Sequence, residues 1–281
     1  MARLVIWVAV FILFGSCLGT PLDKFNKFLQ KCKNWMGCPT QLDMASDSVD
    51  DMYNKCEEKM KEEIEKKFLP NEQNKNENFK QAWNKAEEYY KIKWEKKNTQ
   101  LKKEQIMALH AYTLHVPPLY SEFNDAVRTQ KSEYKTKFPY HTLHFYLTMA
   151  LRTIKPKAEN CVTVFRRTPC KFSTDVLNKE IRFSAFASSS MDEYCDKMFG
   201  EESCFEISTC FGADISQYSK FETEREVLIP PYEVFKVKEI KKSSELNKLP
   251  CKVVYKLQST KTTHSNLNCA FFSKESLLGF N

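Results

Sequence analysis

The spacing of apolar residues changes at Pro156, and this change constrains the fold more than any other feature of the chain. Before it, apolar residues recur at helical spacing over about 50–68, 78–96, 102–112 and 141–154. After it the chain consists of short alternating runs typical of strands, at 161–166, 181–188, 203–209, 227–229, 232–240, 252–258 and 267–272. Helices followed by strands predict an α+β fold.

Pro70 is expected to end the first helix, because proline lacks the backbone N–H that a helix interior needs. The polar run 71–76 is then a spacer before the second helix. That second helix carries an aromatic stripe, in which Phe79, Trp83, Tyr90 and Trp94 recur at helical spacing. Such a stripe is typical of a core-facing surface rather than of a ligand site.

The N-terminal residues predict secretion. Arg3, an apolar run over 4–14 and small residues up to Gly19 have the pattern of a signal peptide, assigned to 1–19. Cleavage there removes Cys17 and leaves an even number of cysteines, which we expect to form disulfides rather than a metal site. The chain ends without an apolar tail, so we predict a secreted protein with no membrane anchor.

The charge pattern argues against nucleic-acid binding. The formal net charge is +7, but lysines and glutamates alternate over 55–67 and 85–97, which indicates solvated helix faces rather than a basic patch. We expect one compact domain after the signal peptide, with a mainly helical region over 20–155 and a β-rich region over 156–281.

Three glutamates alternate directly before the apolar run Val227-Leu228-Ile229, namely Glu222, Glu224 and Glu226. If the strand begins this early, Glu224 and Glu226 point to the same side. Two carboxylates so placed repel each other unless a cation lies between them, which suits a cationic substrate or transition state. A solvated acidic turn is the alternative interpretation.

Arginine, serine and glutamate follow one another on three predicted strands. Arg166 ends the run Val162-Thr163-Val164-Phe165, Ser188 lies in Phe186-Ala187-Ser188-Ser189-Ser190, and Glu224 and Glu226 form Glu-x-Glu. With these residues the chain resembles the arginine-specific mono-ADP-ribosyltransferases of vertebrates, whose R-S-EXE signature is shared with cholera-toxin-like bacterial toxins. The resemblance extends back to Leu42-Asp43-Met44-Ala45, Asp50-Asp51-Met52-Tyr53 and Ala111-Tyr112-Thr113, and so covers nearly the whole mature chain.

The resemblance implies that the helical half packs on a split β-sandwich whose central cleft holds NAD. In that cleft Arg166 would hold the phosphates and the nicotinamide-side ribose. Ser188 would orient Glu226 and the ribose, and Glu226 would bond the ribose 2′-hydroxyl and stabilise the ribosyl cation. Phe199 would lie against the nicotinamide.

The acceptor side of the cleft is implied in the same way. Glu224 would bind the acceptor guanidinium and take its proton. Loop 212–223 resembles the acceptor-recognition loop of the family, with Tyr218 and Phe221 as its exposed aromatics, although a packing role fits either residue equally well. Arg225, inside the EXE, places an unusual cation among the carboxylates.

The resemblance also implies the disulfides Cys56–Cys269 and Cys161–Cys210. The other cysteines exceed the family pattern. Among them we expect Cys195 to pair with Cys204, and we leave Cys32, Cys38, Cys170 and Cys251 unassigned.

The predicted function is an NAD(P)⁺–protein-arginine ADP-ribosyltransferase that releases nicotinamide, uses NAD and possibly NADP, and needs no metal. Its partners would be arginine-bearing extracellular or secretory-pathway proteins, and the enzyme would be a monomer. With only six glycines and no Gly-x-Gly-x-x-Gly, a Rossmann site is excluded, so side chains must hold the pyrophosphate. The alternatives are an NAD glycohydrolase on the same scaffold and a non-catalytic secreted binding protein.

Overall fold

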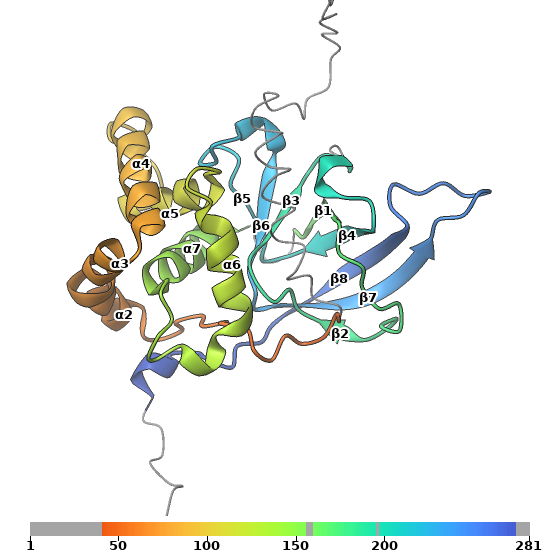
Figure 1. The fold of residues 1–281 in the computed structure, drawn as a ribbon, viewed down its shortest axis with the longest axis horizontal. Helices are drawn as coiled ribbons and strands as arrows, with labels where there is room; N and C mark the ends of the chain where they lie inside the picture. Colours follow the sequence, from red (N-terminus) through yellow and green to blue (C-terminus); the bar gives the residue numbers. More distant parts are fainter. Residues whose placement is uncertain (1–40, 156–159, 195–196, 274–281) are drawn as a thin grey trace, which may run out of the picture.

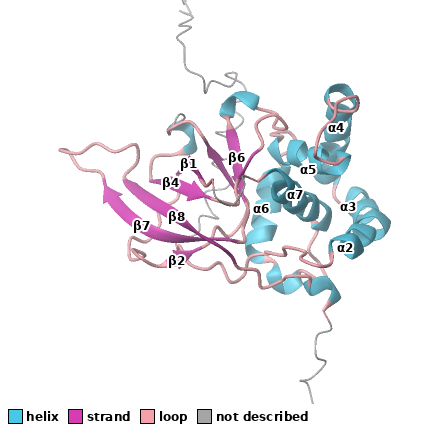
Figure 2. Cartoon of the chain, turned by 180° about the vertical axis from the view of Figure 1, so that it is seen from behind, coloured by secondary structure: helices cyan, strands magenta, loops and turns pink. Residues whose placement is uncertain are grey.

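The computed structural model describes residues 41–155, 160–194 and 197–273. Helices gather on one side of the molecule and a mixed sheet forms the other side (Figures 1 and 2), which confirms the predicted α+β class. The α-helices are α2 (Glu57–Glu63), α3 (Leu69–Lys75), α4 (Glu77–Lys93), α5 (Lys103–Thr113), α6 (Leu119–Thr129) and α7 (His141–Ile154).

The first helical segment does not end at Pro70. α2 continues through a π-helical turn, η2 (Ile64–Phe68), into α3, where Pro70 lies in the first turn. The predicted stop and spacer are therefore wrong, because the first turn of a helix does not use the N–H that proline lacks. α4 begins after Asn76, whose side chain accepts a hydrogen bond from the Phe79 amide at 2.9 Å.

Helix α6 was not predicted from the sequence. The segment nevertheless has helical spacing, and Leu119, Phe123, Ala126 and Val127 are buried in the helical core. α6 lies between the other helices and the sheet (Figure 1), so it brings polar residues to the boundary where the cavity described below is found.

The sheet has the strand order β2-β7-β8-β4-β1-β3-β6-β5 and nearly divides in two. β1 pairs with β4 along its whole length but with β3 only through Phe165 and Ser190. The strands are β1 (Val162–Thr168), β2 (Glu180–Ile181), β3 (Ala187–Ser190), β4 (Ser203–Thr209), β5 (Ala213–Asp214), β6 (Glu226–Ile229), β7 (Glu233–Lys242) and β8 (Val253–Thr263). The weak β1–β3 junction separates two parts of the sheet, as in a split sandwich.

Side chains of β6 join the two hydrophobic cores. Val227 and Ile229 pack in the core between the two sheet parts, whereas Leu228 packs in the helical core. Alternate residues of a strand point to opposite faces, so this short apolar strand packs against both cores at once.

Two predicted strands differ in the structure. The run 181–188 contains the end of β2 and the beginning of β3 rather than one strand, and 267–272 is a turn with the 3₁₀ helix η6 (Ala270–Phe272). The reason for the second difference is long-range. The carboxylate of Asp50 accepts from the Leu267 amide and that of Asp51 from the Cys269 amide, so these amides bond side chains instead of a neighbouring strand.

The disulfides Cys56–Cys269 and Cys161–Cys210 are both present. Cys204 is bonded to Cys251, so the expected pairing of Cys195 with Cys204 is wrong. The parallel pairing of β4 with β8 explains this, since it places Cys204 opposite Val254, close to the segment that contains Cys251. The signal peptide, Cys32, Cys38 and Cys195 lie outside the described residues.

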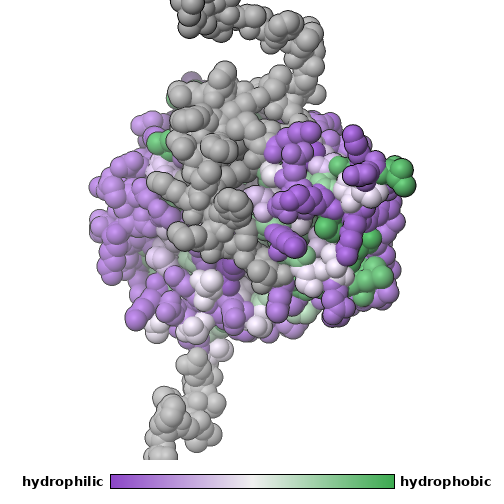
Figure 3. All heavy atoms as spheres, turned by 45° about the vertical axis from the view of Figure 1, so that its right-hand side comes forward, coloured by the Kyte–Doolittle hydropathy of each residue, from purple (hydrophilic) through white to green (hydrophobic). Residues whose placement is uncertain are grey.

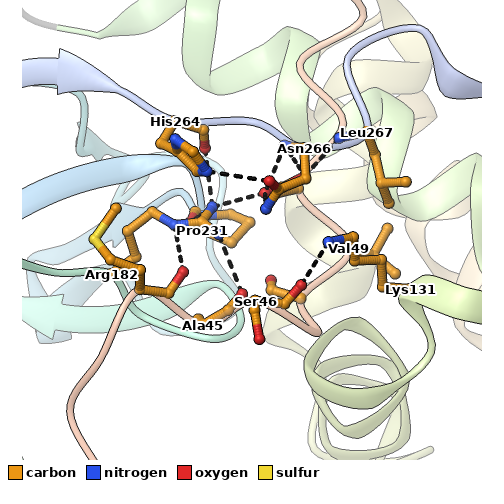
Figure 4. A network of polar contacts seen from close by, with 12 residues as sticks. Ala45, Ser46, Val49, Lys131, Arg182, Pro231, His264, Asn266 and Leu267 are labelled. Carbon is orange, nitrogen blue, oxygen red and sulfur yellow. Dashed lines mark hydrogen bonds and ion pairs between the residues drawn. The ribbon is translucent and has the colours of Figure 1, made fainter.

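A buried ion pair ties the segment before α2 to the sheet. The side chains of Arg182 and Asp50 are both fully buried, and their charged groups are 2.8 Å apart. Arg182 also donates to the carbonyls of Met44, Ala45, Pro231 and His264 (Figure 4). This network holds residues 41–50 against the segment after β2, the turn between β6 and β7 and the segment after β8.

The surface is mainly hydrophilic on the face drawn in Figure 3, with scattered apolar residues. Within the described ranges, the helices are too short or too polar to cross a membrane.

Candidate active site

A cavity of about 680 Å³ opens where β1 and β3 part. Arg166, Ser188, Glu224 and Glu226 all line it, although sixty residues of sequence separate the first from the last. Phe199 and Phe221 line it as well. The weak junction in the sheet therefore brings the residues of the sequence signature around one space.

Arg166 lies on β1 and reaches across the opening to β3, where its guanidinium donates to the main-chain carbonyl of Ser188. Burial lowers the pKa of Arg166 below its usual value. A guanidinium titrates so far above neutral pH that Arg166 stays a cation. The cavity thus has a fixed positive charge at the junction of the two sheet parts.

Tyr112 on α5 is a site residue for which sequence analysis assigned no role. Its hydroxyl donates to the Phe186 carbonyl at 3.3 Å, lies 3.5 Å from Ser188 Oγ and accepts from the side-chain Nδ2 of Asn124 at 3.0 Å. Burial raises the pKa of Tyr112 to about 12, so the phenol keeps its proton at neutral pH. Tyr112 therefore positions the β3 backbone and the Ser188 hydroxyl from the helical side.

Glu226 is the first residue of β6 and is 8% exposed. Its carboxylate accepts from the hydroxyl of Ser219 at 3.3 Å, and Ser219 Oγ accepts in turn from the Phe221 amide at 3.1 Å. Ser219 lies in loop 212–223, but no role was assigned to this residue from the sequence. These bonds link the orientation of the Glu226 carboxylate to the loop before it.

Glu224 reaches the cavity from a turn rather than from a strand. It ends the 3₁₀ helix η5 (Glu222–Glu224), and Arg225 has a left-handed backbone with φ of 45° before β6 begins. The condition for Glu224 and Glu226 to share one strand face is therefore not met, because β6 begins only at Glu226. The turn is held by Ser190, whose hydroxyl donates to the Glu224 carbonyl at 2.8 Å, and by the Met191 amide, which donates to the Arg225 carbonyl at 3.1 Å.

The predicted loop aromatics differ in position. Tyr218 is 1% exposed and stacks on Trp94 at 4.9 Å, so the expectation that it is an exposed aromatic is wrong. The loop packs against the helical side of the molecule near α4 and α5, and this contact buries the Tyr218 ring. Phe221 is half-buried, lines the cavity and lies 4.5 Å from the ring of His115.

Phe199 lies on the wall of the cavity, and the glycine after it is required by packing. Gly200 has φ of +106°, and a Cβ there would lie 2.3 Å from the backbone nitrogen of Pro169. Only glycine accommodates this close approach and this backbone conformation. The wall that carries Phe199 is therefore packed directly against the end of β1.

A second arginine, Arg128, faces the same cavity from α6. Its Nε donates to Ser184 Oγ at 3.3 Å, and its Nη1 pairs with Asp125 at 2.6 Å. It was missed because α6 itself was missed. Arg167 and Arg182 line the cavity as well, so it combines four arginines with the carboxylates of Glu224 and Glu226. Within the described ranges, histidine, cysteine and carboxylate side chains form no cluster of three or more that could hold a metal ion.

Comparisons with known proteins agree with this arrangement. The family pattern of NAD:arginine ADP-ribosyltransferases matches residues 42–262. Human ecto-ADP-ribosyltransferase 5 is 34% identical over 253 residues, which cover 85% of this chain and 83% of that protein. The erythroblast NAD(P)(+)–arginine ADP-ribosyltransferase of Gallus gallus is 35% identical over 202 residues, which cover 70% of this chain and 66% of that protein.

A solved structure shares the fold. The eukaryotic mono-ADP-ribosyltransferase ART2.2 superimposes with a TM-score of 0.69 at 29% identity, covering 84% of this chain and all of that one. A variant of ART2.2 has been solved in complex with NAD. The chain therefore belongs to the family of NAD:arginine ADP-ribosyltransferases.

Proposed function

We propose that this protein transfers ADP-ribose from NAD to the guanidinium group of arginine in other proteins and releases nicotinamide. The observation that carries the proposal is the cavity at the β1–β3 junction, where Arg166, Ser188, Glu224 and Glu226 meet. Membership of the family supports the same activity.

The cavity suits a dinucleotide. Its volume of about 680 Å³ is within the usual range for small-molecule sites. NAD carries two phosphates, and Arg166 and Arg128 supply two forked cations without any glycine-rich loop. Phe199 offers an aromatic surface for the nicotinamide ring. NADP is a further candidate substrate on the same grounds of charge.

The reaction begins when the bond between nicotinamide and ribose breaks, with the bonding electrons leaving on nicotinamide and a cation developing on the ribose. The carboxylate of Glu226 would stabilise that cation and accept a hydrogen bond from the ribose 2′-hydroxyl. Its orientation is already set by Ser219. Ser188, placed by Tyr112 and Arg166, would orient the ribose.

Glu224 would bind and activate the acceptor arginine. An arginine guanidinium is protonated at neutral pH and is a poor nucleophile in that form. A carboxylate that binds it and accepts its proton as the new C–N bond to the ribose forms would both position and activate it. The turn at Arg225 places Glu224 at the cavity beside Glu226 but on a separate element.

Two other functions remain as alternatives. In an NAD glycohydrolase water would replace the acceptor arginine. Glu224 would then have no guanidinium to bind or deprotonate, so its presence at the cavity favours transfer. A non-catalytic binding protein would not need Arg166, Ser188, Glu224 and Glu226 together in one cavity.

The test is an assay with labelled NAD and agmatine. Wild-type protein should yield ADP-ribosyl-agmatine. Glu224→Gln should lose transfer by at least about 100-fold, as for loss of a general base, while it retains hydrolysis of NAD. Glu226→Gln should lose both reactions. Transfer by Glu224→Gln at the wild-type rate would refute the role of Glu224, and release of free ADP-ribose alone by wild type would favour the glycohydrolase.

We further propose that the protein is secreted, acts as a monomer and modifies arginines of extracellular or secretory-pathway proteins. The disulfides fit an oxidising compartment, and the human relative is named as an ecto-enzyme.

A further inference from the structure

Two further carboxylates lie near Glu224, one in the same turn of the chain and one on the wall of the cavity. Glu222 lies in the same 3₁₀ turn and is 59% exposed at its side chain. Asp192 follows β3 and lines the cavity. An acceptor arginine that approaches Glu224 would bring its neighbours in the polypeptide past these two acidic groups.

Each of these two carboxylates forms an ion pair with a cationic side chain. Lys93, at the end of α4, forms an ion pair with Glu222 and donates to the Gln217 carbonyl at 3.2 Å. Partial burial disfavours the charged amine, but hydrogen bonds to Glu222 and Tyr89 outweigh it, so the pKa of Lys93 is raised. Lys93 is therefore charged at neutral pH and cancels the charge of Glu222.

Arg225 forms the ion pair with the second carboxylate, Asp192. Its Nη1 lies 2.7 Å from Asp192, and its Nη2 contacts the sulfur of Met191. The side chain of Arg225, whose backbone is left-handed, reaches the segment that follows β3. The unusual cation inside the EXE thus pairs with a carboxylate on a different strand end.

We propose that Lys93 and Arg225 determine acceptor specificity by neutralising Glu222 and Asp192 near Glu224, so that basic residues next to the target arginine give little advantage. This inference rests on the proposed transferase function. Both residues act on the charge that the acceptor meets, and neither needs to touch NAD.

The expected effect is small per charge but measurable. Two unit charges about 8 Å apart in a solvent-like dielectric alter binding by about two- to threefold, and the effect disappears near 1 M salt, where the Debye length is about 3 Å. Such ion pairs at the surface add little to stability, so the variants should fold.

The test compares two capped peptides, Gly-Gly-Arg-Gly-Gly and Gly-Lys-Arg-Lys-Gly, which present one arginine without and with basic neighbours. The measured quantity is the ratio of kcat/KM for the two peptides at low salt. Lys93→Gln should raise the ratio in favour of the lysine-flanked peptide by about two- to fivefold, because two lysines then meet an uncompensated Glu222.

A double-mutant cycle separates charge from loop structure, since Lys93 also bonds the Gln217 carbonyl. Glu222→Gln in the wild-type background should lower the ratio, because Lys93 is then left as an uncompensated cation, and Lys93→Gln with Glu222→Gln should return to the wild-type ratio. Arg225→Gln, alone and with Asp192→Asn, gives the matched second cycle. The gain in each single variant should vanish at about 1 M salt.

Three results would overturn the inference: an unchanged ratio in Lys93→Gln and Arg225→Gln, a gain that persists in the double variants, or a gain insensitive to salt. Transfer to the glycine-flanked peptide by wild-type protein tests the proposed function separately. If that transfer is absent, the transferase proposal fails. If it is present with an unchanged ratio, only the specificity inference fails.

Discussion

Replacing Arg182 with methionine tests whether the buried ion pair with Asp50 holds the N-terminal wall of the cavity. Both side chains are fully buried, so the substitution leaves the Asp50 carboxylate without its cation. It also removes hydrogen bonds to four main-chain carbonyls, those of Met44, Ala45, Pro231 and His264.

The size of the effect follows from this burial. Breaking a buried ion pair by removing one partner costs about 3–5 kcal/mol, whereas a typical domain is stable by about 5–15 kcal/mol in total. With a urea dependence of about 3 kcal/mol per M for a chain of this size, the unfolding midpoint should fall by about 1–1.7 M. Because Leu42, Asp43, Ala45 and Ser46 also line the cavity, NAD binding should weaken under native conditions.

The assay is urea unfolding followed by fluorescence, with Lys131→Ala as the matched control. Lys131 bonds the Ser46 carbonyl from the exposed side at 2.7 Å, so its loss should cost less than about 0.5 kcal/mol. Arg182→Met combined with Asp50→Asn should be less destabilised than Arg182→Met alone, because no buried charge is left unpaired. A midpoint shift below about 0.3 M in Arg182→Met would refute the reasoning.

Two further predictions concern stability. Cys251→Ser should lower the free energy of unfolding by about 2–4 kcal/mol, because the disulfide to Cys204 closes a loop of 47 residues between β4 and the segment before β8; an unchanged urea midpoint under oxidising conditions would contradict this. Burial raises the pKa of Glu72 to about 8, so the folded state binds its proton more tightly than the unfolded state, and this contribution to stability is complete below about pH 4.5 and is lost as the pH rises through 8. Glu72→Gln keeps the acceptor for the Thr142 amide without a charge and should flatten the fall in urea midpoint between pH 5 and pH 8.5; an equally steep fall in the variant would be inconsistent with a neutral buried acid.

Much of the fold was predictable because it depends on local spacing. The predicted helices at 102–112 and 141–154 correspond to α5 and α7, and the predicted strand at 203–209 is β4. In a helix or a strand, the residues that face the core recur at a fixed spacing, and this spacing of apolar residues is visible in the sequence. α6 shows the limit, because it was not predicted although its buried residues have the same kind of spacing.

The residue types of the candidate site were also readable from the sequence, since Arg166, Ser188, Glu224 and Glu226 follow in order on predicted strands. Their geometry was not. Glu224 lies on a turn because Arg225 adopts a left-handed conformation beside Asp192 and the Met191 amide. Tyr218 is buried because α4 and α5 receive the loop, and a loop sequence carries no periodic record of such a partner.

The sequence by itself therefore determined the α+β class, most helices and strands, and the chemical groups available for catalysis. The tertiary structure alone decided that β1 and β3 meet at a single residue pair, that Arg128, Tyr112 and Ser219 join the site, and that Cys204 bonds Cys251. The physical reason is range. The spacing of apolar residues reflects the local geometry of one helix or strand. Strand register, buried ion pairs and loop packing depend on contacts between residues that are far apart in the chain.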